Sequence, residues 1–502
     1  MIATIAAHTG ILTIILPFLS GVLCFLTRRR WGQFFGIGTA FIIFILTLKL
    51  GGDVWQSGPS RYAIGGWGNP LGIDLYLDGL SAVLLGITSV VGVCISIYAS
   101  SYFNPHKENN NHYAKMGVFF WPLWLFTWGG LNALFLSSDI FNIYVTLEII
   151  GFSAITLTAL AGSVASLSSA TRYLFLTLLG SLFYLLGVGL LYSAYSTLDL
   201  AALAEIIRPG FISTAAITLM TLGLIIKTAL FPMHFWLPPA HSNAPAPVSA
   251  ILSGLVIMGS FYLLVRLWTE IFAAAITPVA GHILGVLGMI AICVGSVQAL
   301  KQTRLKMMLA YSTAAQVGYM FLLFPLITGN LISQSFAWSG GIYFVLSHAC
   351  AKAAAFMVAG SVIYALGHDR INDLRGLAQR SPISVFAFAL AGVSLMGLPP
   401  SGGFIGKWML LKSAMLSGQW WYAIFIIIGG LLTAGYIFRV LEITFKSPLP
   451  EEKKLAIPLR MQFSALAIAL VSILLGLAAA IPLELLKIGN PVFFKLMENS
   501  AL

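Results

Sequence analysis

The sequence predicts an all-α polytopic membrane protein with about fourteen transmembrane helices. Of its 502 residues, 59% are hydrophobic and only 9% are charged, and its mean hydropathy is +0.94. A soluble core could not bury so much apolar surface. Long apolar runs such as "FFGIGTAFIIFILTLKL" are continuous rather than alternating. They therefore predict helices, in which every backbone group is bonded internally, and not barrel strands.

The apolar runs divide the chain into fourteen predicted spans, because roughly 20 residues at about 1.5 Å each cross the hydrocarbon layer. The first run lacks a basic leader and a small-residue cleavage pattern, so we expect a retained helix and not a signal peptide. The segment "GGWGNPLGIDLYLD", between the second and third spans, is expected to form an external hairpin. The predicted spans are 9–27, 33–50, 79–100, 116–136, 139–161, 171–194, 212–235, 246–268, 276–299, 305–327, 337–365, 382–415, 420–445 and 461–485.

Lysine and arginine gather in alternate loops, which predicts the orientation of the chain. Sixteen of the 27 basic residues lie in one set of loops, and six lie in the opposite loops and the tail. The positive-inside rule therefore places both termini outside the cytoplasm. The net charge of +11 reflects this topology and not a nucleic-acid surface. The larger set is Arg28, Arg29, Arg30, Lys107, Lys115, Arg172, Lys301, Arg304, Lys306, Arg370, Arg375, Arg380, Lys446, Lys453, Lys454 and Arg460; the smaller set is Lys49, Arg61, Arg208, Arg266, Lys487 and Lys495.

A few charged residues fall inside the predicted spans. The basic ones are Lys227, Lys352, Lys407, Lys412 and Arg439. Among the acids, Glu148 lies nine residues beyond Asp139, which places it about 14 Å into its helix. A charge at the bilayer centre costs about 2.5 to 3.5 kcal/mol on insertion scales and usually marks an ion or proton route.

These buried charges do not all carry the same interpretation. Lys412 and Arg439 lie toward helix ends, where long side chains can snorkel to the interface. Lys227, Lys407 and Glu148 are too deep for that, and we expect them to be functional. In "SHACAKAAAFMVAG", His348 and Lys352 are four residues apart and share one helix face, which favours a polar relay.

Two predicted spans are interrupted by prolines beside a buried lysine. In "KTALFPMHFWLPPAHSN", Lys227 precedes Pro232, and "GLPPSGGFIGKW" places two prolines before Lys407. Paired interruptions in two halves of a transporter point to inverted repeats around a midplane ion path. The segments 116–268 and 276–445 each contain five spans, and an odd number reverses the orientation. We therefore expect two half-channel repeats with these bounds, preceded by helices 1–3 in 1–115 and followed by helix 14 and a tail in 446–502.

No motif predicts a cofactor or a metal. The cysteines stand alone in apolar segments, at Cys24, Cys94, Cys293 and Cys350, so neither a disulfide framework nor a zinc or iron–sulfur site is indicated. A chain that binds its own quinone, flavin or haem is not supported, because no glycine-rich nucleotide fingerprint follows a strand. We expect no catalytic activity from the chain alone.

Six stretches, in order from about residue 62 to 410, resemble the antiporter-like, proton-conducting subunits of respiratory complex I, Mrp-type cation/proton antiporters and membrane-bound hydrogenases. They are "YAIGGWGNPLGIDLYLDGLSA", "SSDIFNIYVTLEIIGFSAI", "KTALFPMHFWLPPAHSNAPAPVSAILSG", "RLKMMLAYSTAAQVGYMFL", "SHACAKAAAFMVAG" and "GLPPSGGFIGKW". The resemblance implies fourteen helices with two inverted five-helix repeats and broken helices 7 and 12. The short tail after residue 485 argues against the long lateral-helix extension of the largest complex I antiporter-like subunit. An Mrp-like or hydrogenase-like complex is favoured.

The resemblance also assigns roles. It implies that Glu148 pairs with Lys227, and that water wires and the opening of this charge pair move protons. The implied proton-conducting residues are Glu148, Lys227, Lys306, His348, Lys352 and Lys407. The implied supporting residues are His234, His241, Pro232, Pro399 and Pro400.

Two positions depart from the family pattern. Many relatives carry a lysine on helix 8 where this chain has Met258, so the link between half-channels must use water, His234, His241 or another residue, or else be weakened. Pro239 replaces the acidic residue of the usual "LPDAH" and removes a carboxylate near the break.

The expected function is translocation of H⁺, with Na⁺ as a further candidate, inside a bacterial or archaeal cell (inner) membrane complex. The expected partners are antiporter-like and small membrane subunits, a peripheral redox arm and the lipid bilayer, and no nucleic acid is expected. Two alternatives stay open: a self-sufficient secondary transporter, and an ion-driven membrane partner of a soluble enzyme, as in bicarbonate-accumulating complexes.

Overall fold

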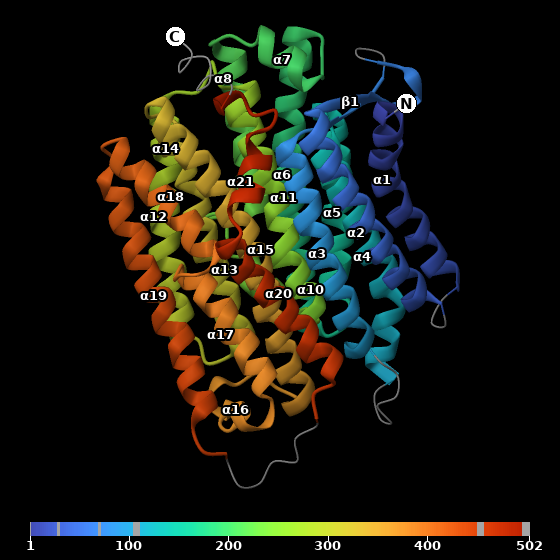
Figure 1. Cartoon of the computed structure of the whole chain (residues 1–502), viewed down its shortest axis with the longest axis vertical. Helices are drawn as coiled ribbons and strands as arrows, with labels where there is room; N and C mark the ends of the chain where they lie inside the picture. Colours follow the sequence, from blue (N-terminus) through green and yellow to red (C-terminus); the bar gives the residue numbers. More distant parts are fainter. Residues whose placement is uncertain (1, 28–30, 69–71, 104–110, 449–455, 494–502) are drawn as a thin grey trace.

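The computed structural model describes the whole chain except residues 1, 28–30, 69–71, 104–110, 449–455 and 494–502. Its helices lie side by side along the long axis in one bundle (Figure 1). Within the described residues, 13 helices are long and apolar enough to cross a membrane. The predicted polytopic helical class is therefore confirmed. Part of the predicted charge asymmetry lies outside the described residues, namely Arg28, Arg29, Arg30, Lys107, Lys453, Lys454 and Lys495.

Three helices and a short hairpin form the N-terminal part. The hairpin pairs its strands antiparallel, with Ser60 opposite Leu77. Asp78 then caps the third helix, because its Oδ1 accepts a hydrogen bond of 2.8 Å from the backbone N–H of Ser81. The elements are α1 (Ile2–Thr27), α2 (Gly32–Ser57), β1 (Ser60–Ala63), η1 (Ile64–Gly66), β2 (Asp74–Leu77) and α3 (Gly79–Tyr102).

The first predicted repeat contains one long, one interrupted and one irregular span. The long helix begins at Val164 and not near residue 171, because the Ser163 hydroxyl caps it by accepting from the N–H of Ser166 at 3.1 Å. Hydropathy alone did not detect this polar first turn. The elements are α4 (Asn111–Leu136), α5 (Ile140–Ala159), α6 (Val164–Tyr195), α7 (Leu200–Ile206), α8 (Phe211–Thr228), α9 (Leu237–Asn243), α10 (Ala246–Ile251), the π-helix η2 (Leu252–Val256), α11 (Ile257–Arg266) and the π-helix η3 (Leu267–Ile271).

The second predicted repeat and the C-terminal helices complete the bundle. Helix α15 starts at Leu331, six residues before the predicted start, because Asn330 caps it by accepting from the N–H of Ser333 at 2.9 Å. The elements are α12 (Pro278–Lys301), α13 (Leu305–Phe321), α14 (Leu323–Leu326), α15 (Leu331–Leu366), η4 (Ile371–Leu374), α16 (Leu377–Arg380), α17 (Pro382–Met396), α18 (Gly402–Leu416), α19 (Trp420–Phe445), α20 (Leu459–Leu477) and α21 (Ala480–Lys487).

Two spans are interrupted where prolines follow the helix end. Helix α8 stops at Thr228, and the next residue, Ala229, has a left-handed φ of 56°. Helix α17 stops at Met396, where Gly397 has a φ of 80°, and Ser401 caps α18 through the N–H of Phe404 at 3.2 Å. The predicted span 382–415 therefore consists of two short helices. The helix in the predicted span 212–235 ends at Thr228, seven residues before the predicted end.

Matching backbone contacts join the loops of each half. The loops before α5 and before α7 meet through Ile140 N–H to Leu198 O and Leu200 N–H to Ser138 O, both 2.9 Å. The loops before α13 and before η4 meet through Leu305 N–H to Asp369 O at 2.8 Å and Ile371 N–H to Thr303 O at 2.9 Å. The same exchange of two bonds thus recurs at corresponding places in the two halves.

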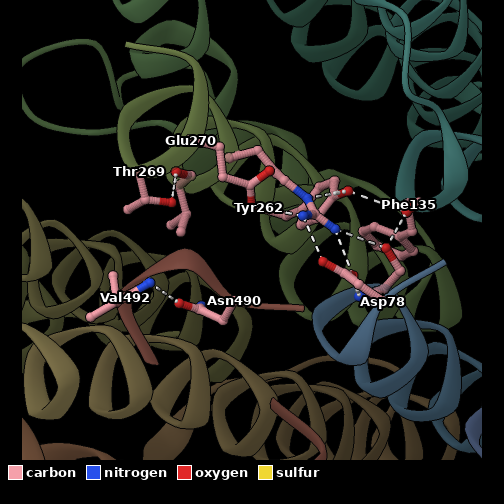
Figure 2. Close-up of polar contacts among 10 residues, drawn as sticks. Asp78, Phe135, Tyr262, Thr269, Glu270, Asn490 and Val492 are labelled. Atoms are coloured by element: carbon pink, nitrogen blue, oxygen red, sulfur yellow. Dashed lines mark hydrogen bonds and ion pairs between the residues drawn. The ribbon is translucent and has the colours of Figure 1, made fainter. Parts of the chain in front are cut away.

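Arg266 was expected in a loop, and this prediction is wrong. It ends α11 inside the bundle, with only 4% of its side chain exposed. Its guanidinium donates to both carboxylate oxygens of Asp78 and to Glu270, each at 2.7 Å, and to the Tyr262 hydroxyl at 3.0 Å. Figure 2 shows Asp78, Tyr262 and Glu270 converging on this group. The distant Asp78 makes burial of the arginine possible, since a buried charge needs a paired, hydrogen-bonded partner.

Candidate functional site

Lys227 and Glu148 meet between three helices. The Lys227 ammonium on α8 lies 3.5 Å from Glu148 Oε1 on α5, and the Ser181 hydroxyl on α6 also donates to Oε1. Only 5% of the Lys227 side chain and 17% of the Glu148 side chain are exposed. The sequence predicted both ions from their depth, but Ser181 was missed because a serine in an apolar helix carries no distinctive pattern.

Close packing of α6 on α8 brings Lys227 and Ser181 to the same place. Added Cβ atoms at Gly180 and Gly223 would lie 2.7 and 2.3 Å from the other residue's carbonyl oxygen. Only small residues allow two membrane helices to approach so closely. The pair of glycines therefore brings Lys227 on α8 close to Ser181 on α6, which donates to the carboxylate that Lys227 contacts.

The break after α8 leaves backbone groups that the next segment satisfies. Pro232 cannot donate a hydrogen bond, and the indole N–H of Trp236 donates to the Ile226 carbonyl at 3.0 Å. Trp236 in turn stacks on Tyr173 with ring centroids 4.2 Å apart. His234 follows the proline in the turn and is half-buried, and its Nδ1 has no hydrogen-bond partner among the described residues. The break is therefore an ordered structure with a half-buried histidine.

His241 lies at the centre of the bundle on α9. It is fully buried, its ring stacks on Phe356 at 4.9 Å, and neither ring nitrogen has a partner among the described residues. Its helix α9 packs on α13, which carries Lys306, and Phe356 lies one turn after Lys352 on α15. Met258 is a buried apolar residue of α11. Of the candidates for a polar link, His241 is thus the one placed beside the lysines of the second half.

Lys306 and Lys352 are both buried, and neutral groups hold them. The Lys306 ammonium donates to the Ala244 carbonyl, which follows α9. Lys352 on α15 donates to the Leu309 carbonyl at 3.0 Å and to the Ser312 hydroxyl at 2.7 Å. One turn earlier, His348 is buried with both ring nitrogens unpartnered among the described residues. Lys306 was counted with the loop residues, but it lies inside, where its backbone N–H also bonds Asp369 at 3.0 Å.

Among the residues that the structure describes, no carboxylate contacts Lys407. Its ammonium donates to the carbonyls of Leu395 at 2.9 Å and Met396 at 3.2 Å. These are among the last carbonyls of α17, which carry the negative end of the helix dipole. The ammonium also lies 4.1 Å from the centroid of the Tyr319 ring and 5.7 Å from that of Phe344. Pro399 and Pro400 follow in the break between α17 and α18, as Pro232 follows α8.

A cavity of about 230 Å³ adjoins Lys407 between α18 and α19. Gly406 permits the approach of α18 to α15, since a Cβ there would lie 2.7 Å from the Phe344 backbone.

Within the described residues, no three His, Cys, Asp or Glu side chains gather as a possible metal site. The buried lysines, histidines and one glutamate therefore suit proton or ion transfer by charge and hydrogen bonding.

The fold and these groups define a class: a multi-pass membrane protein with a row of buried ionisable residues along its core. The chain belongs to the NADH:quinone oxidoreductase/Mrp antiporter transmembrane family, whose model matches residues 137–433. The resemblance seen in the sequence is thereby confirmed.

Similar proteins come from several complexes. The chain is 35% identical over 456 residues to NADH-quinone oxidoreductase subunit N of Desulforudis audaxviator, covering 89% of this chain and 88% of that protein. It is 28% identical over 481 residues to a Na(+)/H(+) antiporter subunit from Alkalihalophilus pseudofirmus, covering 93% and 94%. A chain in the solved Mrp complex from Dietzia sp. shares the fold, with a TM-score of 0.87, 24% identity and 96% of each chain covered.

Proposed function

We propose that the chain is the ion-translocating, antiporter-like subunit of a multisubunit membrane complex and that it moves protons. The observation that carries this proposal is the set of four lysines, Lys227, Lys306, Lys352 and Lys407, none more than 6% exposed in a membrane-type bundle. Such groups are expensive in a bilayer and are retained where ions move. Relatives named as subunits of an oxidoreductase and of a Na(+)/H(+) antiporter support it, and the second name makes Na⁺ the further candidate ion.

The residues divide into two half-channels and a centre. Glu148 and Lys227 form the charge pair of the first half, which exchanges protons as the pair opens and closes. Lys407 serves the second half. Lys306, His348 and Lys352 form the central axis, and His241 supplies the link for which Met258 offers no polar group. His234 extends the path at the first break, and Pro232, Pro399 and Pro400 free backbone groups that admit water.

The two half-channels are inverted repeats, 116–268 and 276–445. The matching pairs of loop hydrogen bonds support this relation, because the same contact joins corresponding loops in each half. Asp139 and Asp199 form the bridge in the first repeat, and Arg304 and Arg370 form it in the second. Opposite charges at the two bridges fit opposite faces of the membrane, with the arginines on the cytoplasmic side.

The chain works in a cell membrane together with other membrane subunits. We place both termini outside the cytoplasm because basic residues favour the opposite end of the bundle. In Figure 1, α16 lies at one end and β1 and α7 lie at the other. The loop around α16 carries Arg370, Arg375 and Arg380. A partner subunit would supply the driving reaction or the exchanged cation.

The test replaces Lys407 by alanine in the complete complex and measures proton uptake into membrane vesicles with a pH-sensitive dye. Lys407→Ala and Glu148→Ala should each abolish transport while native gels show normal assembly. Lys412→Ala is the matched control, since this lysine lies five residues away on α18 but is exposed. Normal transport in Lys407→Ala would overturn the proposed function.

A further inference from the structure

A row of buried polar side chains connects the second-half lysines along α13 and α19. We call this row the hydroxyl network. On α13 the members are spaced four and three residues apart and so share one helix face, and on α19 they are three apart. All are fully buried. The hydroxyl network consists of Ser312, Gln316, Tyr319, Thr433 and Tyr436.

Tyr436 joins the two helices. Its hydroxyl lies 2.7 Å from the Ser312 hydroxyl and donates to the Thr433 hydroxyl at 3.2 Å. Gln316 donates to Thr433 at 3.4 Å, and Thr433 donates onward to the Gly429 carbonyl at 2.8 Å. The side-chain carbonyl of Gln316 has no partner among the described residues. The network is therefore continuous across the helix interface.

Each end of the network holds one of the lysines. At one end, the Lys352 ammonium donates to the Ser312 hydroxyl at 2.7 Å. At the other end, the Tyr319 hydroxyl reaches α19, where it donates to the Ile426 carbonyl at 3.4 Å and lies against Gly429, the residue whose carbonyl accepts from Thr433. The ring of the same tyrosine lies 4.1 Å from the Lys407 ammonium.

The first half has apolar residues where the second half has this network. The loop contacts align Ile140 with Leu305, and on that alignment Ser312, Gln316 and Tyr319 correspond to Leu147, Gly151 and Ala154. Polar groups buried in a membrane bundle are costly unless they are bonded. Ser312, Gln316 and Tyr319 thus occur in the half whose lysine contacts no carboxylate among the described residues, which points to a role in holding charge.

Hydroxyl groups respond to the charge of the lysine that they contact. A protonated Lys352 donates to Ser312, which then donates to Tyr436, which donates to Thr433. A neutral Lys352 can accept from Ser312, so that Tyr436 can turn its proton toward Ser312 and leave Thr433 with Gln316 as its donor. No proton leaves the network in this reversal, because each hydroxyl only rotates.

We propose that the hydroxyl network positions Lys352 and Lys407 and couples them, so that the charge on Lys352 sets how Tyr319 holds Lys407. This inference rests on the proposed proton translocation. Its members are positioning residues, since they act through the two lysines. Tyr436 is the central member, because its hydroxyl contacts both Ser312 on α13 and Thr433 on α19.

The experiment uses Tyr436→Phe in the complete complex, which removes the bridging hydroxyl and keeps the ring. Loss of one hydrogen bond in the coupling should slow proton transport by about fivefold to tenfold. The pH at which transport is half-maximal should also shift. Thr433→Val should behave like Tyr436→Phe, and Thr433→Ser should retain the wild-type profile. If Tyr436→Phe fails to assemble, the two Thr433 variants give the same comparison.

Controls separate coupling from packing and from the proposed function. Tyr422→Phe is the matched control. This buried tyrosine also lies on α19, but its hydroxyl is 2.9 Å from His282 Nδ1 and is not part of the hydroxyl network. In thermal unfolding of the complex, Tyr436→Phe should destabilise less in a Lys352→Ala background than in the wild type, because contacting residues are non-additive. Wild-type rate and pH profile in Tyr436→Phe, or an equal loss of thermal stability in both backgrounds, would overturn the coupling. If Lys407→Ala also transports normally, the proposed function fails instead.

Discussion

Lys227 and Lys407 lie at the two interrupted spans, but the protein holds their charges by different means. Lys227 lies 3.5 Å from a carboxylate. Lys407 contacts two helix-terminal carbonyls and the faces of two aromatic rings. Burial of an ion pair balances charge directly, whereas dipoles and rings stabilise a cation only partly. The first half thus supplies a carboxylate as the counter-ion of Lys227, whereas the second half stabilises Lys407 with carbonyl groups and aromatic rings.

The largest expected effect is on stability. Glu148→Ala leaves Lys227 beside no carboxylate, and breaking a buried pair from one side costs about 3 kcal/mol or more. Lys227→Ala should cost a similar amount, whereas the double variant should recover part of the loss. Lys407→Ala leaves no anion unpaired and should destabilise less. Thermal unfolding of the purified complex measures the series, and equal losses for Glu148→Ala and Lys407→Ala would contradict the difference between the two halves.

The next effect concerns the link between the halves. His241→Ala removes the buried imidazole beside Lys306 and Lys352 and should reduce proton transport by about 100-fold, the lower range for loss of a positioned proton-transfer group. Adding Met258→Lys should restore part of the rate, because it supplies an ionisable group on α11. Transport is measured in vesicles with assembly checked in parallel. Full activity of His241→Ala would show that water, His234 or another residue connects the halves.

A smaller effect is expected at the ring beneath Lys407. Tyr319→Leu keeps an apolar side chain but removes the cation–π contact and should slow transport by roughly fivefold to tenfold, since such contacts contribute about 1 kcal/mol. Tyr319→Phe keeps the ring face and should retain more activity. The two variants should rank in this order in the dye assay. Equal losses in the two variants would mean that the hydroxyl, which both lack, matters more than the ring.

The smallest effect is expected at Ser181. Ser181→Ala removes the hydroxyl that donates to Glu148 but leaves the ion pair intact, so a loss of about 1 kcal/mol or roughly fivefold in rate is expected. Ser181→Thr keeps the donor, although its methyl group must fit beside α8. A loss as large as that of Glu148→Ala would show that the hydroxyl, and not only Lys227, keeps the carboxylate in place.

Charged residues in apolar runs were predictable, and small polar ones were not. Glu148, Lys227 and Lys407 stand out because any ion at membrane depth is costly. Ser181, Ser312 and Thr433 do not, because serine and threonine can satisfy their hydroxyls within their own helix. The prediction that Arg266 lies in a loop was wrong for a related reason. An arginine after an apolar run predicts the end of a span, but here Asp78, far away in sequence, lies within 2.7 Å of it.

The sequence by itself determined the membrane class, the approximate number and order of the spans, the two breaks and the family. Each of these depends on local composition or on a contiguous motif, and hydropathy and proline act locally. Only the tertiary structure decided which groups meet: Ser181 with Glu148, Lys352 with Ser312, and Lys407 with Tyr319. Those contacts join helices that are tens of residues apart or more. They depend on the rotation of each helix and on close packing at glycines, which no single segment specifies.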